Sequence, residues 1–385
     1  MMWEKVKLGD IALNIQTGPF GSQLHQSDYS DVGTTVVMPQ DIVGYSITTH
    51  KIARVGENHV NRLSRYKLNQ GDILFPRRGD VGKCAYITEN EEGWLCGTGC
   101  LKVEINPNVA DSKFIAYQLR LPNLIEWLEK SSVGATMPNI NRDILAGVPL
   151  ELPDLPTQKK VVGTLSNYDA LIEVNEKRIK ILEEMAMRIY REWFVQMRFP
   201  GHQSTQLKKG LPEGWHFGIL LNLGEFRRGK NITKDETILG NIPVVSGGIN
   251  PACYHNKANA KGPVVTVSAS GANAGFTRLY YEDIWAANCS YIDSSCQNIM
   301  YLYVFLKVFK TLIENLQKGA AQPHVYAKDL NNLSIVIPSE KLIKDYQKRV
   351  TPIFQVIHSL NLQNKVLQKM RDRLLPRLMN GKITL

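Results

Sequence analysis

The sequence from residue 154 to residue 194, DLPTQKKVVGTLSNYDALIEVNEKRIKILEEMAMRIYREWF, is a long run of helix-forming residues that recurs in the chain. A shift of 185 positions places it without a gap on residues 339–379, so that Leu182 falls on Leu367. The same shift pairs Met185 with Met370, Gly134 with Gly319, Ala135 with Ala320 and Pro138 with Pro323. Such a constant offset is typical of a duplicated unit.

Both copies carry a stripe of mainly apolar residues at alternating steps of three and four, which lies on one side of an α-helix. The first stripe contains Leu165, Tyr168, Ile172, Asn175, Ile179, Leu182, Ala186 and Ile189. The second contains Val350, Ile353, Ile357, Leu360, Asn364, Leu367, Arg371 and Leu374. One Asn in each stripe would lower stability but fix the register of a coiled coil. We therefore expect the two helices to pair through these seams; the alternative is two unrelated amphipathic helices on separate cores.

The composition is that of an ordinary globular protein with an excess of positive charge. The 385 residues carry a net charge of +10, with a pI near 9.2, which favours an anionic partner and nucleic acid first. Residues 339–385 alone hold ten Lys and Arg against three Asp and Glu. That basic helix either contacts DNA directly, forms a solvated face, or matches an acidic partner helix.

The six cysteines and the hydropathy pattern predict a cytoplasmic protein. The cysteines contain one close pair, Cys96 and Cys100, without a second pair at zinc spacing, so we expect reduced thiols and no metal site. The first residues lack the apolar core of a signal peptide, and no run of 18 apolar residues predicts a membrane span.

Two globular domains, residues 1–153 and 201–338, surround the first long helix, and each mixes short strands, Gly-rich turns and helices. This mixture predicts an α+β fold. The segment Ser268–Gly275 of the second domain parallels the turn RRGDVGK (77–83) of the first. Further expectations concern single elements: a helix near 298–317, a kink or helix start at Pro352, Asp154 or Thr157 as N-cap, and Gly381 as C-cap.

The motifs that would indicate an enzyme are missing. RRGDVGK has Arg77 where a Walker phosphate loop needs Gly and Cys84 where it needs Ser or Thr. No dinucleotide fingerprint follows a strand, and neither Asn106-Pro107 nor Asn250-Pro251 continues as a DNA amino-methyltransferase motif. None of the eight histidines forms a helical i, i+4 pair. The sequence therefore predicts a binding framework without a reaction centre.

Basic and amide side chains near the Gly-rich turns are the candidates for DNA contact. Lys and Arg neutralise phosphates, while Arg, Asn and Gln also read base edges. The candidates are Arg54, Arg62, Arg65, Arg77, Arg78 and Lys83 in the first domain, and Arg227, Arg228, Lys230, Ser270, Asn273 and Arg278 in the second. For each of them the alternative is a solvated or structural side chain.

The whole arrangement resembles the specificity subunits of type I restriction–modification systems. The resemblance is carried by PLELPDLPTQKKVVGTLSNYDALI (149–172), NEKRIKILEEMAMRIYREWF (175–194), the turns GATMPNI (134–140) and GAAQPHV (319–325), and the final LLPRLMNGKITL. The second long helix departs from the family pattern, because it lacks the LP-x-x-Q entry and contains Pro352.

The resemblance implies a pseudo-twofold internal repeat. Two target recognition domains, 1–153 and 201–338, would be separated by an antiparallel coiled coil of helices 154–200 and 339–385. Such a subunit performs no catalysis and binds no cofactor or metal. It would recognise an asymmetric bipartite site in double-stranded DNA and recruit two modification (methyltransferase) subunits and two restriction subunits, which hold S-adenosylmethionine, ATP and Mg. The alternatives are a stand-alone DNA-binding scaffold and the specificity subunit of a type II-like system.

Overall fold

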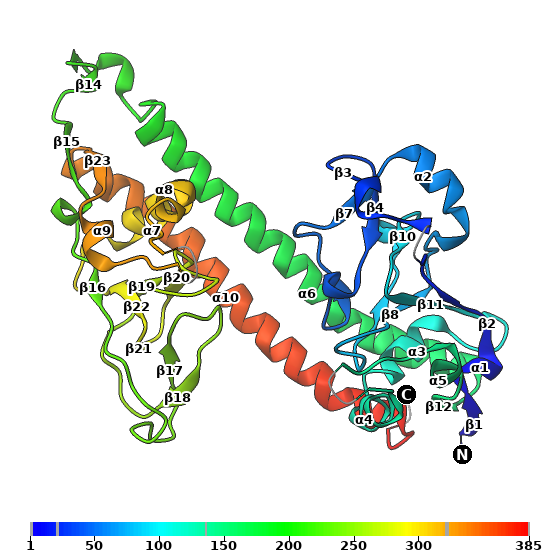
Figure 1. The fold of residues 1–385 in the computed structure, drawn as a ribbon. Helices are drawn as coiled ribbons and strands as arrows, with labels where there is room; N and C mark the ends of the chain where they lie inside the picture. The colour runs from blue at the N-terminus through cyan, green and yellow to red at the C-terminus, as the bar shows by residue number, and fades with distance from the viewer. Residues whose placement is uncertain (1–2, 21–22, 135–136, 320–322, 384–385) are drawn as a thin grey trace. The chain divides into compact units, whose positions relative to one another are not determined.

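The computed structural model describes residues 3–20, 23–134, 137–319 and 323–383 (Figure 1). The chain divides into two compact units: unit 1 comprises Met1–Ile172 with Lys365–Leu385, and unit 2 comprises Glu173–Asn364. Each unit holds one globular domain and parts of both long helices. The units therefore differ from the four segments expected from the sequence, whose boundaries stay predictions.

Unit 1 is built around an antiparallel four-stranded sheet with the strand order β2-β11-β8-β9. Its strands are β2 (Ala12–Thr17), β11 (Cys100–Ile105), β8 (Ile73–Pro76) and β9 (Ala85–Tyr86). Every residue of β8 is buried, because the sheet is covered on both faces. Ile73 and Phe75 belong to the core formed with the helices, whereas Leu74 belongs to a second core.

The two faces of this sheet are covered by different elements. The first core includes residues of α1 (Leu8–Ile11), α3 (Ser112–Gln118), α4 (Pro122–Ser131), α5 (Arg142–Ala146) and the ribbon of β1 (Glu4–Lys7) with β12 (Pro149–Leu152). The second core includes residues of α2 (Glu57–Arg62), the hairpin β5 (Ile42–Val43) with β6 (Ser46–Ile47), and a sheet of β10 (Leu95–Cys96), β4 (Thr34–Val37), β7 (Ala53–Val55) and β3 (Tyr29–Ser30).

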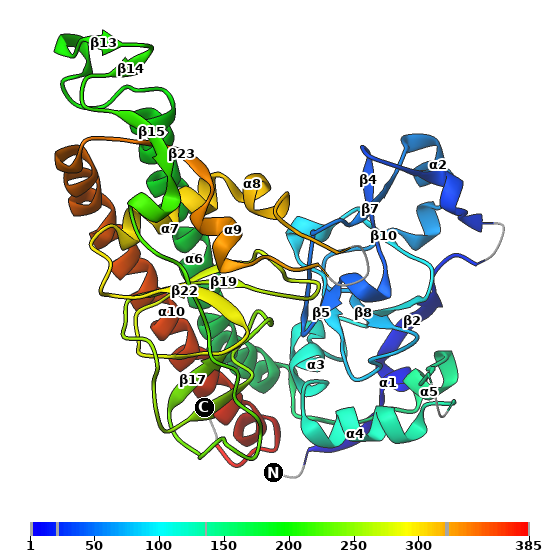
Figure 2. The same cartoon turned by 60° about the vertical axis from the view of Figure 1, so that its left-hand side comes forward.

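Unit 2 repeats this plan with fewer residues. Its four-stranded sheet has the order β16 (Arg227–Arg228), β22 (Cys289–Ile292), β19 (Val264–Ser268) and β20 (Thr277–Tyr280). The smaller sheet contains β18 (Cys253–His255), β17 (Ile242–Val245) and β21 (Trp285–Ala286). The ribbons are β15 (His216–Ile219) with β23 (Ser334–Ile337) and β13 (Leu207–Lys208) with β14 (Leu211–Pro212). The helices are α7 (Ile299–Val308), α8 (Lys310–Glu314) and α9 (Ala327–Asn331), and α7 packs on β19 and β20 (Figure 2).

The strand pairing shows that the two domains share one topology. In both smaller sheets a parallel pair adjoins an antiparallel one: β10 and β7 flank β4, as β21 and β18 flank β17. In both larger sheets the second strand of the order pairs with both neighbours in antiparallel fashion. The duplication expected from the sequence is therefore present in the fold, and unit 1 adds the edge strand β3.

Two long helices contribute to both units: α6 (Leu155–Tyr190), which continues as a π-helical turn at Arg191–Val195, and α10 (Glu340–Met379). In unit 1 the beginning of α6 packs against the end of α10, since Leu165 shares a core with Leu375. In unit 2 the end of α6 packs against the beginning of α10, and the Tyr346 hydroxyl donates to the Ala186 carbonyl at 3.2 Å. Within each unit the two helices therefore run in opposite directions.

The residues of the expected seams lie at these helix contacts or next to them. Leu165, Ile172, Asn175, Val350, Ile357, Leu360 and Asn364 are buried, and Ile179, Leu182, Ile189, Leu367 and Leu374 are half-buried. In unit 2 the Asn175 amide donates to the Asn364 amide oxygen at 2.9 Å, with both side chains buried. This bond satisfies one donor and one acceptor inside the helix pair.

The ends of the long helices follow the expected chemistry. The Asp154 carboxylate accepts the Thr157 N–H at 3.2 Å, which confirms Asp154 as the N-cap of α6. Gly381, two residues beyond α10, has a φ of +66°, which confirms the expected left-handed residue there.

Pro352 was expected to kink the second long helix or to begin it. A helix start is wrong, because Pro352 lies inside α10 between the buried residues Val350 and Phe354. The helix expected near 298–317 is present but interrupted: α7 ends at Val308, Phe309 leaves helical geometry, and α8 follows from Lys310 to Glu314.

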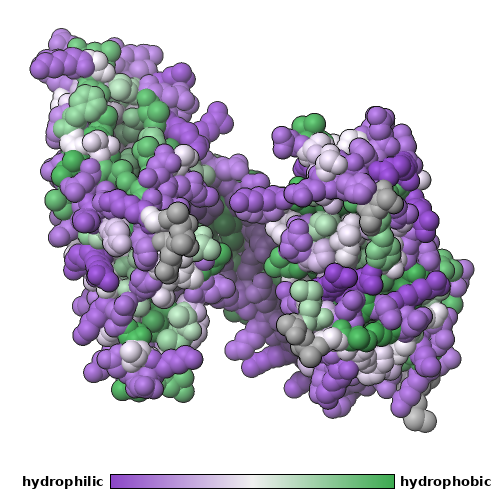
Figure 3. All heavy atoms as spheres, in the orientation of Figure 1, coloured by the Kyte–Doolittle hydropathy of each residue, from purple (hydrophilic) through white to green (hydrophobic). Residues whose placement is uncertain are grey.

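The described part of the chain contains no helix that is long and apolar enough to cross a membrane. The visible face of both units is largely hydrophilic, with separate apolar patches (Figure 3).

Candidate nucleic-acid interface

In both units, loops from separate parts of the chain meet at one end of the four-stranded sheet, which we call the loop end. Among the described residues it contains 18–20, 77–83, 97–99, 133–134 and 137–140 in unit 1, and 228–230, 269–275, 287–288, 318–319 and 323–325 in unit 2. The strand register explains the convergence. Pro76, the last residue of β8, lies opposite Cys100, the first of β11, and Ser268 lies opposite Cys289 in the same way.

In unit 1 the turn after β8 is fixed by backbone hydrogen bonds to two other loops. The Gly79 N–H donates to the Pro138 carbonyl at 3.1 Å, and the Ile140 N–H donates to the Arg77 carbonyl at 2.9 Å. The Arg77 N–H in turn donates to the Gly99 carbonyl at 2.7 Å. These bonds hold the turn in one conformation before any ligand arrives.

The side chains of this turn differ in how far they are restrained. The Arg77 guanidinium donates to the Asn139 side-chain oxygen at 3.3 Å and lies 5.1 Å from the centre of the Phe20 ring. Lys83 forms an ion pair with Asp80 at 2.7 Å. Arg78 is exposed. Arg77 is thus held within the protein surface, and Arg78 projects its charge to solvent.

The same junction occurs in unit 2 with other side chains. The Gly271 N–H donates to the Pro323 carbonyl at 3.1 Å, and the Ser270 hydroxyl accepts from the Asn288 amide at 2.6 Å. Asn273 lies in the same turn and is half-buried, and Arg228 and Lys230 are exposed on the neighbouring loop. The loop end of unit 2 is therefore basic at one side and uncharged in its central turn.

Close backbone approach explains a glycine in each loop end. Gly18 donates its N–H to the Cys100 carbonyl at 2.9 Å, and Gly229 donates to the Cys289 carbonyl at 2.8 Å. A Cβ atom at Gly18 would lie 2.1 Å from a carbonyl oxygen of Gly97, and one at Gly229 would lie 2.2 Å from that of Ala287. Both positions therefore require glycine.

Three candidates of unit 1 lie away from the loop end. Arg54, Arg62 and Arg65 belong to the smaller sheet and α2 or to the turn after it. Arg54 donates to the Gly33 carbonyl at 3.1 Å, Arg62 lies 3.4 Å from the Asp28 carboxylate, and Arg65 lies 5.1 Å from the centre of the Tyr66 ring. These contacts are all with residues outside the loop end.

Arg227 and Arg278 of unit 2 are also separated, because β16 and β20 are opposite edges of the sheet. Arg227 pairs with Asp293 and lies over the Tyr291 ring. Burial alone would raise the pKa of the Asp293 carboxyl, but hydrogen bonds from Ser295 and the charge of Arg227 outweigh it and lower that pKa. Arg278 donates to the Ile249 carbonyl at 2.7 Å. Both guanidiniums thus have partners within the chain.

The structure adds residues that the sequence did not single out: Phe20, Asn139, Asn288 and His324. Asn139 and His324 stand at equivalent positions of the repeated turns GATMPNI and GAAQPHV, so the 185-residue offset was the signal that could have found them. Phe20 and Asn288 have no such signal, because their contacts with Arg77 and Ser270 depend on the loop packing.

A family model described as the type I restriction modification DNA specificity domain matches residues 2–184 and again residues 212–369. Together the two matches cover most of the chain, and each contains one of the two loop ends. The chain belongs to this DNA specificity family. Members of the family are non-catalytic recognition subunits.

Individual relatives extend over nearly the whole chain. A type I restriction enzyme MjaIX specificity subunit of Methanocaldococcus jannaschii is 25% identical over 375 residues, covering 90% of this chain and 86% of the relative. The HindI specificity subunit of Haemophilus influenzae is 22% identical and covers 99% of both chains. The crystal structure of a type I S subunit from M. genitalium has a TM-score of 0.61 at 18% identity and covers 98% and 96%, which shows the same fold.

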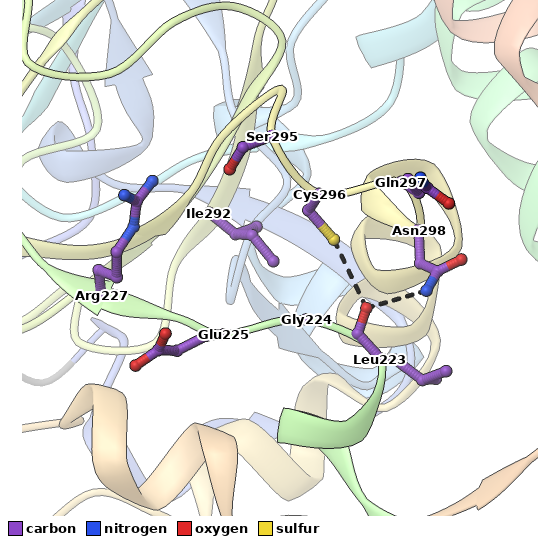
Figure 4. A pocket seen from close by; sticks show the side chains of 9 residues that line it. All are labelled: Leu223, Gly224, Glu225, Arg227, Ile292, Ser295, Cys296, Gln297 and Asn298. Carbon is purple, nitrogen blue, oxygen red and sulfur yellow. Dashed lines mark hydrogen bonds between the residues drawn. The ribbon is translucent and has the colours of Figure 1, made fainter.

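A cavity of about 480 Å³ in unit 2 of this specificity subunit lies beside Arg227 and the start of α7 (Figure 4). Its polar groups are used by the protein: Asn298 donates to the Leu223 carbonyl at 2.9 Å, and the Cys296 thiol lies 3.5 Å from the same oxygen. Burial raises the pKa of the Cys296 thiol, which disfavours the reactive thiolate. The Cys296 thiol and the Asn298 amide therefore serve the internal packing of unit 2.

Proposed function

We propose that this type I specificity subunit recognises a bipartite, asymmetric DNA site, with one half-site bound by the loop end of each unit. The proposal is carried by the presence of two loop ends that share a backbone framework and differ in their side chains. Two loop ends with identical side chains would recognise identical half-sites. The side chains of these two loop ends differ, so the half-sites should differ as well. Phosphate contacts from Arg and Lys would position each domain, and side chains in the grooves would supply sequence specificity.

The paired helices are proposed as the spacer between the half-sites, in the form of an antiparallel coiled coil. α6 has 36 residues, which correspond to a rod of about 54 Å at ~1.5 Å per residue. A turn of B-DNA is about 34–36 Å. A rod of this length is sufficient to hold two domains at half-sites about one helical turn apart, with unread base pairs between them.

An apolar flank beside the seams is proposed as the surface for partner subunits. Each of its residues directly precedes a seam residue, which places it at the edge of the helix pair. In unit 1 the flank contains Leu171, Val366 and Met370, and in unit 2 it contains Val174, Ile181, Met185 and Val356. These side chains are 43–57% exposed, an unusual number for a helix surface without a partner.

The internal repeat gives this flank two matching halves. The 185-residue offset relates Leu171 to Val356, Ile181 to Val366 and Met185 to Met370. A groove of about 370 Å³ in unit 2 is lined by Arg178 of α6 and by Pro352, Val356, Ser359 and Gln363 of α10, so one flank residue, Val356, borders a hollow between the two helices. Two equivalent surfaces fit two copies of a modification subunit.

The remaining parts of the proposal concern the assembled complex. The modification subunits would bind S-adenosylmethionine and methylate adenine, and restriction subunits recruited through them would use ATP and Mg. This chain would hold none of these ligands. The complex would work in the cytoplasm, where the DNA and the thiol-reducing environment are found.

The direct test is to express the full chain with the methyltransferase subunits of its own system in a host without other adenine methylation, and to map methylated adenines across the genome. We expect one split motif with two unlike halves and a fixed spacer. A continuous motif, a palindromic motif or no methylation would contradict the proposal.

A further inference from the structure

Among the described residues, three backbone hydrogen bonds that join the paired turns have counterparts in both loop ends. Gly79 donates to Pro138 as Gly271 donates to Pro323, both at 3.1 Å. Ile140 donates to Arg77 at 2.9 Å as Val325 donates to Ala269 at 3.0 Å. The turn also binds a third loop in both units: Arg77 donates to Gly99 at 2.7 Å, and Ala269 donates to Asn288 at 3.3 Å.

Two glycines and one proline of this framework are the same in both units. Gly79 and Gly271 have φ angles of +83° and +81°, and Gly134 and Gly319 have +109° and +93°. These values favour glycine at both positions. The two prolines that accept the turn bonds, Pro138 and Pro323, are also equivalent. The other backbone bonds are kept although the residues that make them differ, as in Ile140 and Val325.

The side chains presented by the framework are not kept. An isolated antiparallel bridge pairs Arg78 with Asn139 in unit 1, and the equivalent bridge pairs Ser270 with His324 in unit 2. The bridges fix the backbones of these residues opposite each other, and the Asn139 side chain itself accepts from Arg77 at 3.3 Å. The third loop supplies Gly99 in unit 1 and Asn288 in unit 2, whose amide reaches Ser270 at 2.6 Å.

We infer that these paired positions are specificity-determining: Arg78 and Asn139 read base edges in one half-site, and Ser270, Asn288 and His324 read those in the other. This inference rests on the proposed function. A constant framework with divergent side chains is suited to presenting different hydrogen-bonding groups in one fixed geometry. Variation in the framework itself would instead change how each domain sits on the phosphates.

The chemistry of the two sets predicts different bases. Arg78 matches the O6 and N7 acceptors of guanine, and an Asn such as Asn139 matches N6 and N7 of adenine. Arg77, held by Phe20 and Asn139, acts as a positioning residue that keeps the Asn139 amide oriented. The unit 2 set has a hydroxyl, an amide and an imidazole and lacks a guanidinium, so it has no equivalent of the arginine–guanine contact at this junction.

The experiment exchanges the presented side chains between the units and maps methylated adenines with the complete methyltransferase complex. One variant carries Arg78→Ser with Asn139→His, and the other carries Ser270→Arg with His324→Asn. We expect each variant to change the accepted bases in one half-site while the other half-site and the spacer stay as in the wild type. The first variant should lose preference for a guanine by roughly 5- to 150-fold, the discrimination of one bidentate contact.

A milder variant and a charge control keep the test decisive. Arg78→Lys retains the charge and the framework, and we expect it to relax preference at one guanine position even if the double variants fail to assemble. Lys159→Ser removes an exposed charge from α6 in unit 1 and should leave the motif unchanged. Weaker methylation of an unchanged motif by Arg78→Lys would assign Arg78 to phosphates and overturn the inference. If the wild-type complex methylated no split motif, the proposed function itself would fail, which is a separate outcome.

Discussion

At the scale of single residues, the polar contacts that attach the first domain to the long helices are concentrated on Asp169. Its carboxylate accepts from the Tyr117 hydroxyl and from Arg371 at 2.6 Å, and Arg120 lies 3.8 Å away. The Arg120 guanidinium also lies 4.6 Å from the ring centres of Tyr45 and Tyr117. One carboxylate therefore connects a domain helix with both α6 and α10 inside unit 1.

Replacement of this carboxylate should destabilise unit 1 selectively. Asp169→Asn takes the carboxylate away from the partly buried Arg120 guanidinium and leaves Arg371 with Asp372 alone, so we expect a loss of about 1–3 kcal/mol in the free energy of unfolding. Urea denaturation of the full chain measures it, and Glu173→Gln, an exposed carboxylate four residues on, is the control. Equal stabilities of the two variants would show that the contacts around Asp169 carry no net free energy.

A second residue-scale prediction concerns pH in unit 2. Because the folded-state pKa of Asp293 is lowered, its contribution to stability is present above its unfolded pKa of about 4 and is lost as the pH falls through the lower folded value. Wild type should therefore exceed Asp293→Asn in stability at pH 6, by about 0.5–1 kcal/mol because Arg227 is exposed. This gap should shrink towards pH 3. Thermal unfolding across pH 3–6 tests the trend, and a gap that grew on acidification would contradict it.

At the scale of elements, the helix pair is specified by a local pattern that sequence analysis reads well. The alternation of three and four positions marks the side of α6 and α10 whose side chains are buried or half-buried, because that spacing depends only on helix geometry. The bond between Asn175 and Asn364 lies within the same pattern. By contrast, the break at Phe309 between α7 and α8 was not expected, because the residue pattern is helical on both sides of it.

Substitutions of the two seam asparagines should have coupled effects on the free energy of unfolding. Asn175→Leu alone leaves the buried Asn364 amide without its partner, so we expect a loss of about 1–3 kcal/mol. The double variant Asn175→Leu with Asn364→Leu removes both amides. Its free energy of unfolding should return to the wild-type value or exceed it, while the register of the two helices becomes less well fixed. A double-mutant cycle by urea denaturation measures the coupling. Additive effects of the two substitutions would argue against an energetically significant bond.

The apolar flank gives the second prediction for the helices. Ile181→Glu with Met185→Glu, and separately Val366→Glu with Met370→Glu, introduces charges at exposed positions, where folding tolerates them. We expect each pair to prevent binding of one modification subunit, because an apolar contact would then bury two charges. Light scattering of the complex counts the bound subunits, and Lys177→Glu with Lys180→Glu on α6 is the control. Retention of two bound subunits by both flank variants would remove the flank from the interface.

At the scale of the whole molecule, the sequence predicts the duplication of the domains but does not predict the order of the strands in their sheets. The constant offset predicted two similar domains, and the fold contains them. The DNA-contact candidates were chosen by residue type near glycine-rich turns, and they fall into separate groups: Arg77 and Arg78 meet at the loop end, whereas Arg54 lies on another sheet. Strand order brings distant loops together, and it follows from tertiary packing, so spacing in the sequence could not supply it.

The spacer proposal makes a quantitative prediction for the complete chain. Insertion of one heptad in both helices, after Lys177 and after Leu362, keeps the seams in phase and lengthens each helix by about 10 Å, since ~1.5 Å is added per residue. B-DNA rises ~3.4 Å per base pair, so the unread segment should grow by about three base pairs. We expect mapped methylation to show both half-site motifs unchanged around the longer spacer. Insertion in only one helix breaks the pairing and should abolish methylation. An unaltered spacer in the doubly extended protein would show that some other contact sets the distance between the half-sites.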